Sequence, residues 1–281
     1  MPRDVGDCRD FGHARDFPDL SRLKAVLFDL GGTLWDPFDG KDRESVLGEV
    51  ARAVALSLAL RGRAADLLTA SLLDSLVSLR DGQRLASCDC FADPALREGN
   101  LEEVAVRAMA KAGNPQGEQS MGESGQACVS RLALALGEEL TKRSRLYDDT
   151  LPALRALRES RPDLKLGIVS NTVVQPEIID MHLGRCGLLD LVDFRVLSSE
   201  VGWRKPHPAI YSAALVRAGA RAQETLLVGD RILEDVAGPK RLGMMAALCR
   251  SLEDQRNSAV TRGPDLEVAD LSTLVRLLTG T

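Results

Sequence analysis

The chain has 281 residues, of which 44% are hydrophobic and 27% charged, and its formal net charge is −5 at pH 7. This composition is typical of a globular protein with a sizeable core, and a low aromatic content with an acidic balance argues against a nucleic-acid partner. With no apolar run near the ~18 residues of a membrane span, no secretory-type leader and too few cysteines for a disulfide framework, we expect a cytoplasmic protein with no membrane partner.

The N-terminal third combines a polar tail, one strand and a long helical segment. Residues 1–22 are polar and lack periodicity, so we expect a disordered tail. The apolar run 24–28 stops at Asp29 and a glycine pair, which predicts a short buried strand. Residues 39–146 show apolar residues at helical spacing without a strand-like run, which predicts an insert of about four helices. Within it, the Gly-, Gln-, Glu- and Ser-rich stretch 113–126 predicts a flexible loop.

After the insert, short apolar runs alternate with helical patterns of about ten residues. The predicted strands are 164–169, 191–197, 225–228 and 245–249, and the predicted helices are 151–159, 176–186, 208–218 and 234–242. This alternation is typical of a parallel sheet with right-handed crossovers. The predicted fold class is therefore α/β, a Rossmann-like parallel sheet with an inserted all-helical cap: a core of residues 23–38 and 147–281, and a cap of residues 39–146.

Four polar residues follow the predicted strands or lie just beyond them: Asp29, Ser170, Lys205 and Asp230. Each one alone would more often be a turn or helix-capping residue. Together they matter, because the carboxyl ends of the strands in an open α/β sheet border one crevice. Two carboxylates there can hold Mg²⁺, while a lysine and a hydroxyl group can bind a phosphoryl group.

Four segments, in this order, resemble the four motifs of the haloacid dehalogenase-like hydrolase superfamily: residues 28–34, 169–171 and 204–206, and Gly229-Asp230 with Asp235. The resemblance covers residues 24–278, and the helical insert lies where that family has its type 1 cap. It implies that Asp29 is the nucleophile, which becomes an aspartyl phosphate. It also implies that the Ser170 hydroxyl binds the transferring phosphoryl group and that Lys205 balances its negative charge.

The resemblance further implies a Mg²⁺ site and a small phosphorylated substrate. Asp29, Asp230 and the main-chain carbonyl of Gly31 match the metal ligands, and Asp235 matches the second acid of its motif, which supports Lys205 or a metal-bound water. The remaining expected site residues, for supporting the nucleophile loop and binding substrate, are Thr33, Asn171 and Arg204. The expected oligomeric state is a monomer or homodimer.

One position departs from the family pattern. Phosphatases of this family usually carry a second Asp two residues after the nucleophile, which protonates the leaving oxygen and then activates water; here that residue is Gly31. Such acid/base groups typically contribute ~10²–10⁴-fold to the rate. Three explanations are open: the substrate has a good leaving group, the protein hydrolyses slowly and acts partly as a binder, or another residue substitutes, with the candidates Asp36, Asp39 and His207.

The same departure leaves other reactions open. Haloacid dehalogenases of the superfamily also lack this Asp and need no metal, and phosphonatases use a cap lysine as a Schiff base, for which this cap offers Lys41, Lys111 and Lys142. The pairing of Asp230 with Asp235 resembles the metal-using branch. We therefore predict a Mg²⁺-dependent phosphatase that acts on a small phosphorylated metabolite. The alternatives are a metal-independent 2-haloacid dehalogenase and a catalytically weak binding protein.

Overall fold

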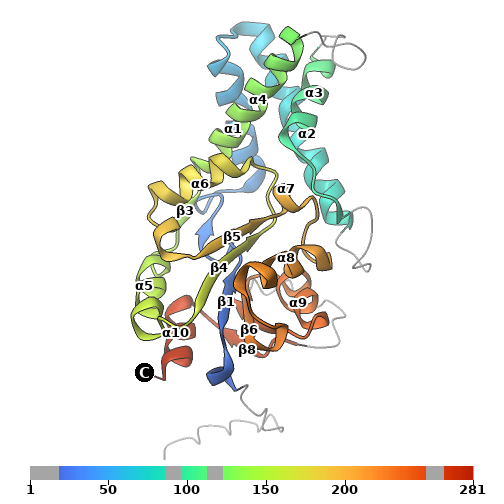
Figure 1. Cartoon of the computed structure of the whole chain (residues 1–281). Coiled ribbons are helices and arrows are strands. Elements are labelled where there is room, and N and C mark those ends of the chain that lie inside the picture. The colour runs from blue at the N-terminus through green and yellow to red at the C-terminus, as the bar shows by residue number, and fades with distance from the viewer. Residues whose placement is uncertain (1–18, 87–95, 113–122, 251–262, 281) are drawn as a thin grey trace, which may run out of the picture.

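The structure, a computed structural model, describes residues 19–86, 96–112, 123–250 and 263–280. A parallel sheet flanked by helices forms one body, and a group of helices stands beyond one edge of it (Figure 1). The expectations for residues 1–18 and for the loop residues 113–122 lie outside the described part. Two neighbouring expectations need correction: residues 20–22 form a short 3-10 turn rather than tail, and residues 123–126 belong to a helix rather than a loop.

The predicted parallel sheet is confirmed. Within the described residues it has six strands in the order β5-β4-β1-β6-β7-β8, all paired in parallel. The strands are β1 (Ala25–Phe28), β4 (Lys165–Ser170), β5 (Phe194–Leu197), β6 (Thr225–Gly229), β7 (Met245–Cys249) and β8 (Leu266–Val268). The order reverses at β1, which pairs with β4 on one side and β6 on the other. Such a reversal opens a crevice beyond the carboxyl ends of the strands, and Asp29 follows β1 directly.

Both faces of the sheet are covered, which explains why β1 is apolar and buried throughout. Successive side chains of a strand point to opposite faces. Val26 and Phe28 pack in the same cluster as residues of α5 (Thr150–Ser160) and α10 (Leu271–Thr279). Leu27 packs on the other side with residues of α8 (Pro208–Ala218), among them the fully buried Tyr211. The central strand is therefore held from both sides, and so is the position of Asp29 at its end.

The predicted helix over 234–242 is wrong in its geometry. A π-helical turn, η6 (Ile232–Ala237), comes first and the short helix α9 (Gly238–Arg241) follows. Pro239 has no N–H to donate to a helical partner, and the Tyr211 hydroxyl donates a 2.5 Å hydrogen bond to the Glu234 carbonyl. Both effects favour a wider turn at this point. The other helices of this body are α6 (Pro176–Arg185) and α7 (Ser198–Val201).

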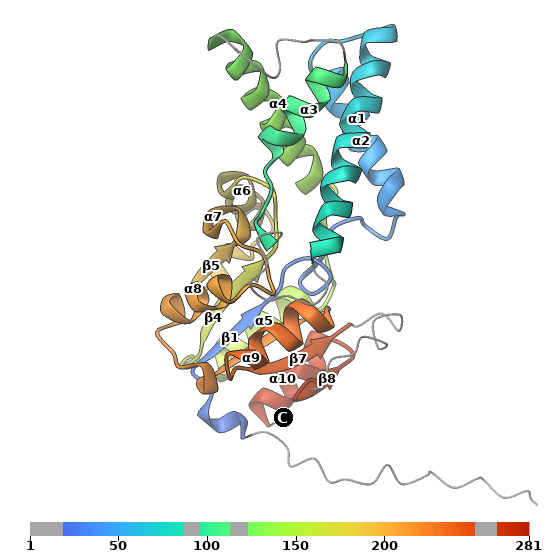
Figure 2. The same ribbon diagram turned by 90° about the vertical axis from the view of Figure 1, so that its right-hand side faces the viewer.

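Two very short strands border the helical insert, and the second of them takes up residues 145–146, which we expected to belong to the insert. β2 (Trp35–Asp36) pairs antiparallel with β3 (Arg145–Leu146), so the chain leaves and re-enters the sheet body through one ribbon, which the sequence did not predict. The helices of the insert are α1 (Arg43–Ser57), α2 (Gly62–Ala86), α3 (Leu101–Lys111) and α4 (Glu123–Thr141). They stand above the sheet body and pack against one another (Figure 2). Among the described residues no helix is long and apolar enough to cross a membrane.

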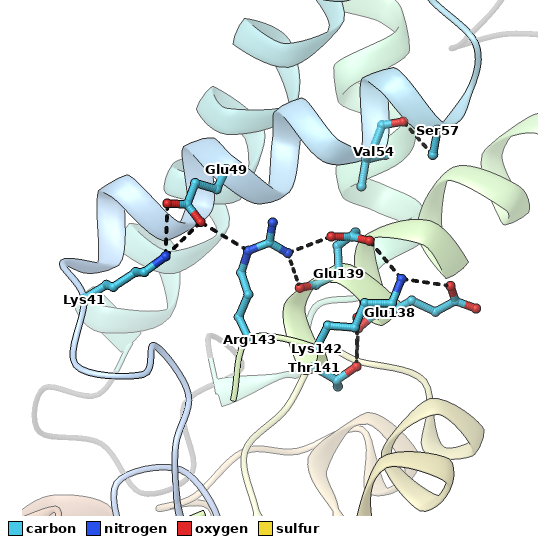
Figure 3. A network of polar contacts seen from close by, with 10 residues as sticks. Lys41, Glu49, Val54, Ser57, Glu138, Glu139, Thr141, Lys142 and Arg143 are labelled. Atoms are coloured by element: carbon cyan, nitrogen blue, oxygen red, sulfur yellow. Dashed lines mark hydrogen bonds and ion pairs between the residues drawn. The ribbon is translucent and has the colours of Figure 1, made fainter. Parts of the chain in front are cut away.

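Ion pairs join the two ends of the insert (Figure 3). Glu49 of α1 accepts from Lys41 at 3.3 Å and lies 3.6 Å from Arg143, which follows α4. Arg143 and Lys142 in turn contact Glu139 at 2.7 and 2.9 Å. Most of these side chains are partly exposed, and such pairs contribute about 0–1 kcal/mol each. The network therefore aligns the ends of the insert more than it stabilises the fold.

Candidate active site

Lys205 lies at the buried centre of the site. Its Nζ donates to Asp29 Oδ1 at 2.7 Å and to Asp235 Oδ1 at 2.6 Å, and the residue is 2% exposed. Burial alone lowers the pKa of a lysine, but the charges of Asp235 and Asp29 outweigh it and hold the pKa of Lys205 above its ordinary value. The ammonium group is therefore charged throughout the physiological range, and it holds two of the carboxylates in place.

Three carboxylates converge beside this lysine. One oxygen each from Asp29, Asp230 and Asp235 lies within 4.8 Å of the others. Burial, with the charges of Asp29 and Asp235, raises the pKa of Asp230 to about 8. Burial also raises the pKa of Asp235 to about 7, although Lys205 opposes the shift. The single ammonium group of Lys205 therefore cannot compensate the negative charge of all three carboxylates.

The unpaired oxygen of Asp230 tests whether the cluster fits a metal ion. Asp230 Oδ1 is buried and has no hydrogen-bond partner among the described residues. A buried carboxylate oxygen of this kind is costly unless a donor or a cation satisfies it. Clustered carboxylate oxygens are the ligands that hard divalent cations prefer. The acidic cluster could therefore hold such a cation.

Two glycines let the carboxylates approach the backbone this closely. Gly32 has φ +84°, and a Cβ there would lie 2.5 Å from Asp230 Oδ2. A Cβ at Gly229 would lie 2.2 Å from the carboxylate carbon of Asp235. Any larger residue at either position would push one acid away from the cluster. The turn at η6 completes the arrangement, because the Arg231 N–H donates to Asp235 Oδ2 at 3.0 Å.

Ser170 ends β4, the strand next to β1, and Asn171 follows it directly. Ser170 is the buried last residue of β4, at the same edge of the sheet as Asp29. Asn171 makes a reciprocal pair with the main chain of Lys205: Nδ2 donates to the carbonyl at 3.0 Å, and Oδ1 accepts from the N–H at 2.7 Å. The amide of Asn171 is thus occupied in fixing Lys205, while Ser170 stays at the edge of the crevice.

Thr33 and Arg204 differ from the other expected residues. Thr33 is buried, and its hydroxyl has no hydrogen-bond partner in the described chain. Arg204 is also buried, but its guanidinium contacts Glu98 of the helical insert at 3.1 Å. The structure therefore does not bring the Arg204 side chain into the group of carboxylates around Lys205.

The space at Gly31 is open to a side chain. A Cβ built on this residue meets only ordinary van der Waals neighbours, Pro37 Cγ and Trp35 Nε1, both at 3.9 Å. Gly31 also lacks the positive φ of Gly32. Nothing in the local backbone therefore requires glycine at the position where family phosphatases carry their acid.

None of the expected substitutes for that acid lies in the cluster. The two oxygens of Asp36 accept from the N–H groups of Phe38 and Gly40 at 2.8 and 2.6 Å, which makes Asp36 a turn residue. Asp39, at φ 50°, faces Arg145 at 3.9 Å. The His207 Nδ1 accepts from an N–H at the start of α8. Each of these side chains therefore has another partner, and none belongs to the cluster of Asp29, Asp230 and Asp235.

The cap lysines considered for a Schiff base are likewise used within the insert. Lys41 and Lys142 belong to the ion-pair network of Figure 3, and Lys111 pairs with Asp74. All three are about half exposed. Their environment therefore lacks the burial that makes a lysine amine nucleophilic.

Arg250 is a residue of the site region that the sequence reasoning missed. It follows β7 directly, and its Nε donates to the Thr33 carbonyl at 3.4 Å, while its guanidinium pairs with Asp149 and stacks over Tyr147 at 4.3 Å. Asp149 also accepts from the N–H of Leu271 at 2.9 Å. Arg250 thus joins the loop that follows Asp29 to the chain returning from the insert. Its signal in the sequence was its place directly after a predicted strand, the same signal that marked Asp29.

The chain resembles proteins of known activity over part of its length. The glyceraldehyde 3-phosphate phosphatase of Methanopyrus kandleri is 34% identical over 129 residues, covering 43% of this chain and 52% of the relative. The ribulose-1,5-bisphosphate 5-phosphatase of Halopiger xanaduensis is 32% identical over 120 residues, covering 41% and 48%. The chain thus spans about half the length of these relatives.

Solved structures and a family model extend the likeness. A 2-haloacid dehalogenase from Pseudomonas syringae shares the fold with a TM-score of 0.63 at 24% identity, over 92% of this chain and 99% of that chain. A phosphatase from Thermococcus onnurineus does so with a TM-score of 0.55, also at 24% identity and the same coverage. The model of haloacid dehalogenase-like hydrolases matches residues 23–243. Together with the grouping of Asp29, Asp230 and Asp235 around Lys205, this match shows that the chain belongs to the haloacid dehalogenase-like hydrolase family.

Proposed function

We propose that the chain is a Mg²⁺-dependent phosphatase that hydrolyses a small phosphorylated metabolite through an aspartyl phosphate on Asp29. The observation that carries this proposal is the carboxylate cluster around Lys205, with the unpaired, buried oxygen of Asp230. A reaction without a metal would leave that oxygen unsatisfied. The names of the partial relatives, phosphatases of glyceraldehyde 3-phosphate and ribulose-1,5-bisphosphate, agree with the proposed reaction class, the hydrolysis of a small phosphate ester.

The proposed reaction has two steps. An Asp29 oxygen attacks phosphorus, the bond from phosphorus to the leaving oxygen breaks, and an acyl phosphate forms on Asp29. Water then cleaves this acyl phosphate, which releases inorganic phosphate and restores the carboxylate. Lys205 balances the negative charge of nucleophile and phosphoryl group, and the Ser170 hydroxyl donates to a phosphoryl oxygen. Mg²⁺, held by Asp29, Asp230 and the Gly31 carbonyl, would neutralise phosphoryl charge when bound.

Gly31 limits the leaving group. The three expected substitutes for the missing acid, Asp36, Asp39 and His207, have other partners outside the carboxylate cluster. The proposed substrates therefore have leaving oxygens that depart without a proton, such as acyl or anomeric phosphates. In this proposal residues 39–146 act as the cap, which closes over the carboxyl ends of the strands and supplies specificity.

The test is phosphate release from a panel of acyl phosphates and phosphomonoesters, with Mg²⁺ or with EDTA. We expect release by the wild type with Mg²⁺ only, and none by Asp29→Asn. The variant Asp163→Asn is the matched control, because this aspartate lies on the surface and pairs with Arg161. Halide release from 2-haloacids in EDTA, without phosphate release, would replace this proposal with a dehalogenase. Silence in both assays would leave a binding protein.

A further inference from the structure

A segment of the helical insert docks on the sheet body at a point far from the β2–β3 ribbon. Leu96, Arg97 and Glu98, which precede α3, run beside the loop Gly202–Arg204. The Arg204 N–H donates to the Leu96 carbonyl at 2.9 Å, and the Glu98 N–H donates to the Gly202 carbonyl at 3.1 Å. Figure 2 shows the chain that leads into α3 reaching down to the sheet body. The insert therefore touches the loop that carries Lys205.

The docked segment brings a buried carboxylate with it. The side chain of Glu98 is 1% exposed and that of Arg204 is 9% exposed, and they pair at 3.1 Å. The Ser198 hydroxyl also donates to the Glu98 carboxylate. Ion pairs as buried as this one are weak contributors to stability, because desolvation offsets the attraction. An apolar pair would serve a purely structural contact at least as well, so the charges call for another explanation.

Glu98 connects, through its two partners, to both loops that present phosphate-binding groups. Arg204 directly precedes Lys205 in the chain. Ser198 Oγ accepts from the Thr172 N–H at 2.7 Å, and Thr172 follows Asn171. Asn171 and Lys205 are themselves joined by their reciprocal hydrogen bonds. The loop after β4 and the loop of Lys205 are thus fixed to each other and to one carboxylate from the insert.

We propose that Glu98 is a positioning residue, which holds the loop of Lys205 and the loop that follows Ser170 at the separation that phosphoryl transfer needs. Arg204, in this view, is the partner of Glu98 and does not bind substrate. The active site is then complete only while the insert is docked at this segment. The inference rests on the proposed phosphatase activity. It adds that the insert must be docked for the active site to be aligned, besides covering that site.

The first test is kinetic and uses p-nitrophenyl phosphate with Mg²⁺. Glu98→Gln keeps the shape of the side chain and removes its charge. Because small displacements of catalytic groups are costly, we expect kcat to fall about 10- to 100-fold, with KM changed less than about threefold. The matched control is Glu49→Gln, which breaks an ion pair within the insert (Figure 3) and should leave both constants unchanged. An unchanged kcat with a raised KM would overturn the proposal, since it would place Arg204 on the substrate.

A double variant separates positioning from folding. Glu98→Ala alone leaves Arg204 buried without its partner and could unfold the protein, whereas Glu98→Met with Arg204→Met replaces both charges by apolar side chains of similar length. We expect this variant to melt cooperatively near the wild-type temperature and to keep the low kcat of Glu98→Gln. A folded double variant with wild-type kcat would show that the contact is only structural and would overturn the proposal.

Hydrogen–deuterium exchange gives a readout that does not need turnover. In Glu98→Gln we expect faster exchange in peptides covering residues 171–172 and 202–205, and no change there in Glu49→Gln. If the wild type hydrolyses none of the compounds, the proposed function fails, and the exchange experiment still decides whether Glu98 holds the two loops. Unchanged exchange in both peptides would overturn the positioning role.

Discussion

The variant Gly31→Asp should convert this site into one that accepts poor leaving groups. The structure has room for the new side chain, because a Cβ at Gly31 lies 3.9 Å from its nearest neighbours, Pro37 Cγ and Trp35 Nε1, in an ordinary backbone conformation. The carboxyl group would then occupy the position at which family phosphatases protonate the leaving oxygen. The substitution should therefore add an acid without displacing the carboxylates around Lys205.

The size of the gain follows from the chemistry of that acid. General acid catalysis is worth ~10²–10⁴-fold, or about 3–5 kcal/mol in the barrier. We expect the lower end, about 10²-fold, because a new carboxylate within reach of the Trp35 indole N–H would have its charged form stabilised, which lowers its pKa and leaves less of the protonated form to donate. The gain should appear for alkyl phosphates, whose leaving oxygen needs a proton. It should vanish for acyl phosphates and dinitrophenyl phosphate, whose leaving groups depart as anions.

The assay is kcat/KM with Mg²⁺ across phosphates of increasing leaving-group basicity. The control is Gly31→Asn, which has the same size and cannot donate a carboxylic proton. Wild type and Gly31→Asn should lose rate steeply as the leaving group becomes more basic, and Gly31→Asp should lose it less. Parallel slopes for Gly31→Asp and Gly31→Asn would refute the argument that Gly31 marks a missing acid.

Three further predictions concern the carboxylate cluster. Lys205→Met removes the ammonium group from the buried carboxylates, so urea unfolding in EDTA should show an unfolding free energy lower by about 3–5 kcal/mol, which Mg²⁺ partly restores. A loss of stability that Mg²⁺ does not change would contradict the proposed metal site. Gly32→Ala puts a Cβ 2.5 Å from Asp230 Oδ2, so calorimetry should show Mg²⁺ binding weakened by at least about tenfold. If Gly32→Ala and Gly31→Ala bound Mg²⁺ with equal affinity, this prediction would be wrong. The pKa of Asp230, raised from 3.8 to about 8, means that the metal-free folded state keeps a proton that the unfolded state loses. The stability that this proton contributes is thus full below pH 3.8 and is lost as pH rises through 8, by up to about 1.4 kcal/mol per pH unit. In EDTA, the unfolding free energy of wild type relative to Asp230→Asn should therefore fall between pH 3.8 and 8, and in excess Mg²⁺ it should not. A difference that stays constant with pH in EDTA would contradict this prediction.

Short-range patterns were enough to predict the central part of the fold. The strands at β1, β4, β6 and β7 are apolar runs that stop at polar or glycine residues, so their ends could be placed to within a residue. The same stops located Asp29, Ser170 and Asp230. Helix α8 was equally clear, because Pro208 begins it and Gly219 ends it with a positive φ. These signals are local, and tertiary contacts did not override them.

The unpredicted features depend on contacts between distant residues. The π-helical turn at Ile232–Ala237 needs Tyr211, which is far away in the sequence. β8 and α10 are short elements that were not predicted. β8 is stabilised by pairing with β7, and the apolar residues of α10 pack in one cluster with those of α5. Arg204 shows the limit for the site: its place beside Lys205 suggested a substrate contact, and only the fold shows that Glu98 pairs with it.

The contacts of the insert and of the chain returning from it indicate that the insert does more than cover the site. On the returning chain, the Thr150 hydroxyl and the Tyr147 N–H donate to the Leu34 carbonyl at 2.7 and 3.2 Å, and Leu34 belongs to the loop that follows Asp29. At the docked segment, Glu98 reaches the loop of Lys205. A cover could move freely without disturbing the groups beneath it, whereas movement here would pull on the loops that hold Asp29 and Lys205. Closure of the insert and the alignment of nucleophile and lysine are therefore expected to occur together, which would restrict phosphoryl transfer to substrates small enough to let the insert dock.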